Sequence, residues 1–211
     1  MAPTRAELDA QLHRYLDLLL ARNASLNLTA VRDPVKAWEK LILGSLAVLD
    51  AHDFRGDERV ADVGSGGGLP GIPLKLALPG LALCLVESDQ RKAEFLLDAV
   101  AALELTGVEV EPRRAEELGR DPRHRDAYDV VVTRAAARAP VAAEYCLPLL
   151  KPAGVLIALA KYSDWDGARR AIGQLGGRLQ GEAKGAVVVR KLRPTPDQFP
   201  RRVGIPGKRP L

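Results

Sequence analysis

At the start of this chain, apolar residues recur with the period of a helix. Further along, short apolar runs alternate with helical patterns. A capping box, Thr4-Arg5-Ala6-Glu7, begins the first helical pattern. Leucines and one tyrosine then recur every three or four positions over 8–19, which predicts a helix that runs to about Ala21. Asp33-Pro34 supplies an N-cap with proline at the first helical position, and it predicts a second helix that reaches about Asp50.

From Arg59 onward, short apolar runs alternate with helical segments. Strands are expected at Arg59–Val63, Leu81–Glu87, Val108–Glu111, Tyr128–Thr133, Gly154–Ala160 and Ala186–Lys191. Helices are expected at about Pro70–Leu78, Asp89–Leu105, Val141–Leu150 and Trp165–Leu175. This alternation predicts an α/β fold with a doubly wound, mainly parallel sheet. We expect residues 1–55 to form an N-terminal helical cap and residues 56–211 to form the main domain, packed together as one compact unit.

A glycine-dense turn follows the first of these strands. Gly64, Gly66 and Gly68 allow positive φ and leave no side chain between a ligand and the main chain. Such a turn before a helix offers free N–H groups and the positive end of the helix, which suit a carboxylate, a phosphate or an adenosine group. Any tight strand-to-helix loop can carry glycines, so the turn alone does not decide what binds there.

Two acidic residues flank the turn in the predicted fold. Asp62 precedes Gly64 by two residues, and Glu87 ends the next strand, where a carboxylate accepts hydrogen bonds from ribose hydroxyls. Dinucleotide enzymes favour G-x-G-x-x-G, whereas S-adenosylmethionine-dependent methyltransferases favour an acidic residue followed by G-x-G-x-G. The second pattern fits better. A purely structural role, capping the turn, also stays open for Asp62.

Basic residues stand at the ends of two later strands. Arg134 ends the fourth strand, where it can hold a carboxylate or a phosphate bidentately. Lys161 follows the fifth strand, where it can bind RNA backbone or a target base. A surface ion pair is the alternative for each residue. No Ser-His-Asp constellation and no pair of catalytic carboxylates stands out, which argues against a hydrolase.

Composition narrows the class of protein. The 211 residues are 47% hydrophobic and 27% charged, as in an ordinary globular protein, and they contain no apolar run long enough for a membrane span. The charged N-terminus does not resemble a secretory signal. Two cysteines and three histidines lie without metal-ligand spacing, so we expect reduced thiols, no metal site and a cytoplasmic location.

Charge is concentrated in the last part of the chain. Residues 190–211 hold seven basic residues and one acidic residue, a net charge of +6, which leaves −2 for residues 1–189 within the total of +4. A polyanion such as nucleic acid is one partner for this segment, and a solvated terminal tail is the alternative.

Several separate motifs make the chain resemble the RsmG (GidB) family of ribosomal RNA guanine-N7 methyltransferases over nearly its whole length. They are Asn27-Leu28-Thr29-Ala30-Val31-Arg32, Asp62-Val63-Gly64-Ser65-Gly66, Leu69-Pro70-Gly71-Ile72-Pro73-Leu74, Arg91-Lys92, Phe95-Leu96, Arg114-Ala115-Glu116-Glu117, Thr133-Arg134-Ala135, Leu149-Leu150-Lys151-Pro152, Ala160-Lys161, Thr195-Pro196 and Phe199-Pro200-Arg201-Arg202-Val203-Gly204-Ile205-Pro206. The chain departs from the family pattern at Arg22, Leu41, Gly44 and Tyr162.

The resemblance implies a Rossmann-like methyltransferase fold, S-adenosylmethionine as cofactor, and one guanosine in the decoding-region loop of 16S (small-subunit) rRNA as the target. By matched position it implies cofactor contacts at Gly64, Leu69, Ala115, Glu116 and Arg134. With the residues argued above, the full set of expected cofactor contacts is Asp62, Gly64, Gly66, Gly68, Leu69, Glu87, Ala115, Glu116 and Arg134.

The chemistry that the resemblance implies is a direct methyl displacement, because guanine N7 has a free lone pair and no proton to lose. Positioning should then dominate the rate effect. Asn27, Arg134 and Lys161 are the expected catalytic residues, and the expected RNA-binding residues are Lys161, Arg201, Arg202 and Lys208.

We expect a monomer that acts on small-subunit rRNA or the assembled small ribosomal subunit, without membrane or metal. Two alternatives remain: a methyltransferase that acts on a small molecule or a protein, and a non-catalytic rRNA-binding assembly factor with a vestigial cofactor pocket.

Overall fold

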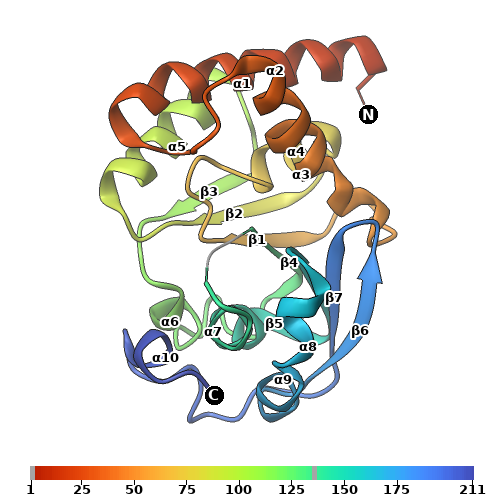
Figure 1. The fold of residues 1–211 in the computed structure, drawn as a ribbon, viewed down its shortest axis with the longest axis vertical. Coiled ribbons are helices and arrows are strands. Elements are labelled where there is room, and N and C mark those ends of the chain that lie inside the picture. Colours follow the sequence, from red (N-terminus) through yellow and green to blue (C-terminus); the bar gives the residue numbers. More distant parts are fainter. Residues whose placement is uncertain (1–2, 135–136) are drawn as a thin grey trace.

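The fold is a seven-stranded sheet between two layers of helices, and the computed structural model describes residues 3–134 and 137–211 (Figure 1). The strands are β1 (Arg59–Val63), β2 (Ala82–Val86), β3 (Val108–Glu111), β4 (Tyr128–Arg134), β5 (Leu150–Leu159), β6 (Gly177–Ala183) and β7 (Ala186–Lys191). Their order is β3-β2-β1-β4-β5-β7-β6; β1 to β5 run parallel, and β7 is antiparallel to both of its neighbours. The predicted doubly wound, mainly parallel sheet is therefore confirmed.

Helical segments before, between and after the strands complete the two layers. They are α1 (Arg5–Leu26), α2 (Pro34–Ala37), the π-helix η1 (Trp38–Leu43), α3 (Gly44–Leu46), η2 (Ala47–Asp50), α4 (Gly71–Ala77), α5 (Gln90–Ala102), α6 (Ala115–Leu118), α7 (Ala139–Cys146), η3 (Leu147–Leu149), α8 (Tyr162–Asp166), α9 (Arg169–Gln174) and α10 (Ile205–Lys208). Ala135, the last residue of one family-like motif, lies outside the described residues.

The two faces of the sheet carry separate cores, because successive side chains of a strand point to opposite faces. Val60, Leu85 and Val130 lie in the core shared with α1, α4 and α5. Ala61 and Val131 lie in the core shared with α7 and α9. The helices before β1 therefore cover the same face as α4 and α5. In the part of the chain that the structure describes, no helix is both long and apolar enough to cross a membrane.

The two N-terminal helices are confirmed with local differences. The capping box at Thr4 is present, but α1 runs five residues past its expected end, to Leu26. The second helix spans Pro34 to Asp50 as predicted and is capped by Asp33, yet its middle, Trp38–Leu43, is a π-helix. Spacing of apolar residues does not distinguish a π turn from an α turn over so short a stretch.

Three further differences concern the later part of the chain. Strand β6 was not predicted, because its exposed alternate positions are polar and it contains glycines. It lies at the edge of the sheet, where a strand needs no long apolar run. The single helix expected at Trp165–Leu175 is two short helices, α8 and α9, separated at Gly167. Short α6 and α10 were not predicted as helices.

Candidate cofactor site at the carboxyl ends of the strands

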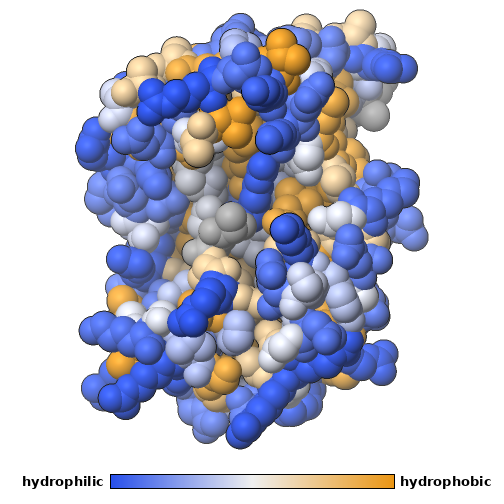
Figure 2. All heavy atoms as spheres, viewed as in Figure 1, coloured by the Kyte–Doolittle hydropathy of each residue, from blue (hydrophilic) through white to orange (hydrophobic). Residues whose placement is uncertain are grey.

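A cavity of about 270 Å³ opens at the carboxyl ends of β1 and β2, where the strand order reverses between β1 and β4. Ligands of doubly wound sheets bind at this place. On the face shown in Figure 2, hydrophilic residues lie along most of the margin, and white to orange residues are exposed between them. The cavity is lined by Val63, Gly64, Gly66, Val86, Glu87, Ser88, Lys92, Arg113, Arg114, Ala115, Glu116 and Tyr145.

The glycine turn forms one wall of this cavity, but it does not offer a row of free amides. Gly64, Gly66 and Gly68 have φ of 73°, 56° and 91°, so the turn needs conformations that other residues rarely adopt. The N–H groups of Gly64 and Ser65 both donate to the carbonyl of Val86 at 3.0 Å, and those of Gly68 and Leu69 donate to the carbonyl of Ser65. The expectation of free N–H groups was therefore wrong for these four amides, and the turn contributes mainly by lacking side chains.

Glu87 joins the turn to the next helix. One carboxylate oxygen accepts from the amide of Gly66 at 2.9 Å, and the other accepts from the amide of Asp89 at 2.8 Å. Only 9% of Glu87 is exposed, and that part faces the cavity. The two backbone bonds fix the carboxylate and leave it further lone pairs for hydroxyl donors.

Gly66 faces open space on the cavity side. A Cβ atom added there would have the carbonyl oxygen of Gly64, 3.9 Å away, as its nearest heavy atom. Gly68 differs, because a Cβ atom there would lie 2.5 Å from the side chain of Ile72. Gly68 and the buried Leu69 do not line the cavity, and they support the turn from the core side.

Asp62 lies buried beneath the turn. Its Oδ2 accepts from the amide of Gly71 at 2.9 Å, at the start of α4, while Oδ1 is buried with no partner among the described residues. Burial raises the pKa of this carboxyl to about 7, and Glu87 adds to the rise. Asp62 thus has the capping role that the sequence left open, and it keeps one unused acceptor.

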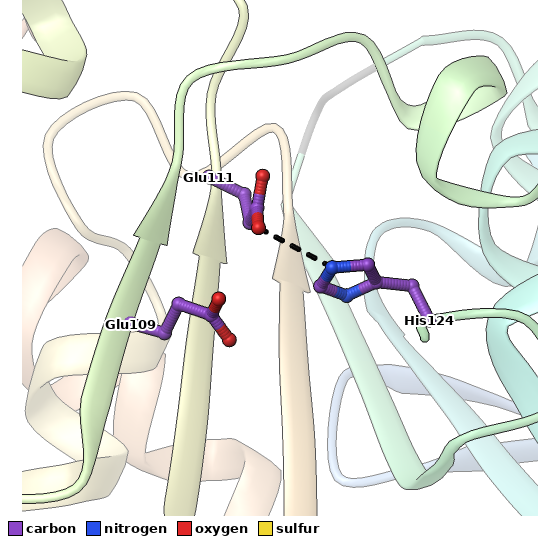
Figure 3. Close-up of side chains that lie close together, drawn as sticks. All are labelled: Glu109, Glu111 and His124. Carbon is purple, nitrogen blue, oxygen red and sulfur yellow. Dashed lines mark ion pairs between the residues drawn. The ribbon is translucent and has the colours of Figure 1, made fainter. Parts of the chain in front are cut away.

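The loop after β3 forms the wall opposite the turn and contains an ion-pair network that sequence reasoning missed. Arg113, which lines the cavity, donates from Nε to Glu111 at 2.7 Å and from Nη1 to Asp121 at 3.0 Å. The ring of His124, 1% exposed, lies 3.3 Å from Glu111 through Nε2 (Figure 3) and 2.6 Å from the hydroxyl of Tyr128 through Nδ1. His124 carries no sequence signal, because eleven residues separate it from Arg113.

Glu109, Glu111 and His124 bring possible metal-ligand atoms within 4.8 Å of one another (Figure 3). Glu109 is exposed, however, and Arg113 already takes an oxygen of Glu111. Glu111 and Asp121 therefore form ion pairs that hold Arg113 at the cavity wall, with the ring of His124 against Glu111.

Helices α6 and α7 complete the cavity. Ala115 and Glu116 line it, and Glu116, 2% exposed, accepts from the amide of Gly204 at 3.0 Å. Tyr145 on α7 lines the same cavity and was not singled out from sequence, since it reads as one more apolar position of a helix. The C-terminal segment thus packs directly behind the cavity wall.

The residues expected to be catalytic lie apart from this lining. Arg134 is half-buried, and its Nη2 donates to the carbonyl of Lys40 in η1 at 2.9 Å. Burial lowers the pKa of its guanidinium. Lys161 is exposed at the N-cap of α8, and Asn27 is exposed at the C-cap of α1 with a φ of 50°. None of these three side chains is among those that line the cavity.

The expected RNA-binding residues of the C-terminal segment divide into two groups. Arg201 is engaged by Glu144, which is fully buried, at 2.6 Å. Arg202 and Lys208 are exposed.

The chain is similar to known proteins over most of its length. Residues 8–171 match the GidB family, described as rRNA small subunit methyltransferase G. The ribosomal RNA small subunit methyltransferase G of Pelotomaculum thermopropionicum is 42% identical, with 95% of this chain and 90% of that protein covered. The protein of the same name from an Exiguobacterium species is 41% identical, over 96% and 90% of the two chains.

Among solved structures, the fold is similar to that of precorrin-6y C5,15-methyltransferase from Geobacter metallireducens. The TM-score is 0.54 at 15% identity, and the match covers 71% of this chain and 87% of that one. At this identity the likeness concerns the fold alone.

Proposed function

The chain belongs to the GidB family of rRNA small subunit methyltransferases, and from that premise we propose that it transfers a methyl group from S-adenosylmethionine to N7 of a guanosine in the decoding-region loop of 16S rRNA. The observation that carries the proposal is the cavity beside Glu87 and the glycine turn, at the strand-order reversal of a methyltransferase-type sheet.

The groups around the cavity suit the parts of S-adenosylmethionine. Glu87 is fixed by two backbone bonds and can accept from ribose hydroxyls. Two groups outside the cavity lining suit the methionine end. The Oδ1 of Asp62, buried and without a partner among the described residues, can accept from an ammonium group, and Arg134 supplies a cation for the carboxylate if it leaves the carbonyl of Lys40. Arg113, Ala115 and the other residues after β3 enclose the space left for an adenine ring.

S-adenosylmethionine, when bound, supplies a methyl group on a positively charged sulfur. The protein's own task is to align guanine N7 with that methyl group and to exclude water, so positioning supplies most of the rate effect. No general base is required, because N7 has a lone pair in the ring plane and no proton. The base has to leave its stack to be reached.

The purine gains positive charge as the methyl group arrives, so basic residues serve the reaction best by holding phosphates. Lys161, Arg202 and Lys208 are exposed cations in this proposal, with Asn27 at the rim. The partner is small-subunit rRNA, either free or in the assembled subunit.

Reduction followed by aniline scission tests the proposal, since N7-methylated guanosine becomes labile to this treatment. The protein and S-adenosylmethionine are incubated with free small-subunit rRNA and, in parallel, with assembled subunits. One new strand break at a single guanosine, dependent on both protein and cofactor, is expected with at least one substrate.

Other products would redirect the assignment. A methylated ribose or pyrimidine would contradict the N7 assignment. Tight rRNA binding without methyl transfer would favour the assembly-factor alternative, and turnover without RNA would favour a small-molecule or protein substrate.

A further inference from the structure

A buried tyrosine of the N-terminal cap is bonded to the glycine turn. Tyr15 on α1 is 0% exposed, and its hydroxyl donates to the carbonyl oxygen of Gly67 at 2.6 Å, across 52 residues of sequence. Burial and the nearby Asp62 raise the pKa of the Tyr15 hydroxyl well above its ordinary value. The hydroxyl therefore keeps its proton and remains a donor at physiological pH.

The bond acts next to the residue that holds Glu87. Gly66, whose amide donates to Glu87 at 2.9 Å, directly precedes Gly67, whose carbonyl accepts from Tyr15. Glycine gives this turn little stiffness of its own, since each glycine has more accessible conformations than any other residue. The bond from α1 to the Gly67 carbonyl thus restricts the turn two peptide groups after the amide that donates to Glu87.

Side chains of α1 and of the segment that follows it also pack closely against Gly67. A Cβ atom added at Gly67 would lie 2.6 Å from Cδ1 of Leu19 and 3.5 Å from Cβ of Leu28. Residues of the cap therefore pack closely against one side of the turn at Gly67, while Gly66 faces open space and lines the cavity. The turn lies between the cap and the cavity.

We propose that Tyr15 is a positioning residue for cofactor binding: its bond to Gly67 holds the turn in the conformation that places Gly66 and Glu87 at the cavity. This inference rests on the proposed function, because it takes S-adenosylmethionine as the ligand. It assigns to the N-terminal cap a part in building the cofactor site, in addition to covering the sheet.

The test compares two tyrosine variants that lose the same atom. Tyr15→Phe is expected to raise the calorimetric dissociation constant for S-adenosylmethionine by about 2- to 10-fold, the range for one neutral hydrogen bond. The rise in melting temperature on adding saturating cofactor should shrink with it. Tyr162→Phe is the control, because the hydroxyl of Tyr162 accepts from Arg169 at 2.5 Å instead of bonding to the turn, and Tyr162 does not line the cavity.

A purely structural role would give a different result. Tyr15→Phe would then melt earlier but bind the cofactor as tightly as Tyr162→Phe and the unmodified protein do, which would overturn the inference. If Tyr15→Phe does not fold, Leu19→Val tests the packing of the same helix beside Gly67, and unchanged cofactor binding in that variant would overturn the part that the inference assigns to the cap. If the unmodified protein binds no S-adenosylmethionine at all, the proposed function itself fails.

Discussion

Arg201 and Glu144 form a two-point ion pair that attaches the C-terminal segment to α7. Nη2 of Arg201 lies 2.6 Å from Oε2 of Glu144, Nε lies 2.9 Å from Oε1, and the backbone amide of Arg201 donates to Oε1 at 2.8 Å. Glu144 is 0% exposed, so its charge has no access to water and depends on this partner. Arg202, one residue later, is exposed. Two adjacent arginines thus have different surroundings.

We predict that substitution of Arg201 changes stability, whereas substitution of Arg202 changes RNA binding. Arg201→Ala leaves a buried carboxylate without its partner and should lower the free energy of unfolding by about 3 kcal/mol, the lower end for a broken buried pair since 24% of the Arg201 side chain is exposed. Arg202→Ala should leave stability unchanged and reduce the slope of log affinity for rRNA against log salt by about 0.7–0.9, the loss of one phosphate contact. Urea unfolding and binding titrations at several salt concentrations measure the two effects.

The tail would have a purely structural role if Arg202→Ala kept the full salt slope. In that case the RNA surface would move to the N-terminal helices and the rim around Asn27. Lys208→Ala provides a second exposed position for the same salt measurement.

A second prediction concerns the open side of the turn. Gly66→Ala places a methyl group in cavity space, since its nearest protein atom would be 3.9 Å away. It should weaken S-adenosylmethionine binding by about 1–3 kcal/mol, the usual cost of inserting a methyl group into filled space. Calorimetry gives the affinity, and circular dichroism reports whether the fold is intact.

Backbone strain at Gly66 needs its own control, because φ is 56° there. Gly185→Ala is suitable: φ is 83°, a Cβ atom there would have no heavy atom within 4 Å, and the residue joins β6 to β7 away from the cavity. Both variants should lose similar stability from the left-handed conformation. If both bound the cofactor with unchanged affinity, the cavity would not be the cofactor site.

The sheet and its order of elements were predictable because most strands of the parallel part, such as β1 and β2, are short, nearly continuous apolar runs, while the parallel edge strand β3 alternates valine and glutamate. The burial of Val60 to Val63 on both faces has a direct counterpart in the sequence. The edge strand β6 has no such counterpart, because polar side chains such as Arg178 and Gln180 occupy its exposed positions. Pairing with β7 decides its conformation, and that is a long-range effect of the fold.

The candidate site was predictable where it depends on local sequence and unpredictable where it depends on side chains that meet in space. The positions of Gly66 and Glu87 follow from the strand-turn-helix order. The bond from Tyr15 to Gly67 spans 52 residues, and the engagement of Arg134 by the carbonyl of Lys40 spans 94. Such contacts leave no spacing pattern in the chain.

A third prediction separates the roles of the two basic strand-end residues. Arg134→Ala should weaken S-adenosylmethionine binding by about 1.5–3 kcal/mol, as expected for one charge-assisted hydrogen bond, and turnover should fall with it. It should also lower stability, because Arg134 bonds the carbonyl of Lys40 in the cap. Lys161→Ala, at an exposed position, should spare cofactor binding and reduce methyl transfer to RNA. Calorimetry and methyl-transfer assays on both variants measure these effects, and a loss of RNA binding alone in both would contradict this division.

The last prediction uses the buried carboxyl of Asp62, whose pKa is raised from 3.8 to about 7, mainly by burial. A group that holds its proton more tightly in the folded state favours folding most below its unfolded pKa, and this contribution is lost as the pH rises through the folded value. The stability that Asp62 contributes should therefore fall between about pH 4 and pH 7. Asp62→Asn removes this titration. The free energy of unfolding of the variant minus that of the unmodified protein should therefore increase as the pH rises from about 4 to about 7. Urea unfolding of both proteins from pH 4 to pH 8 gives the difference, which also cancels the titration of all other groups. A difference that does not change with pH would mean that Asp62 ionises at its ordinary pKa and that its unpartnered oxygen is solvated.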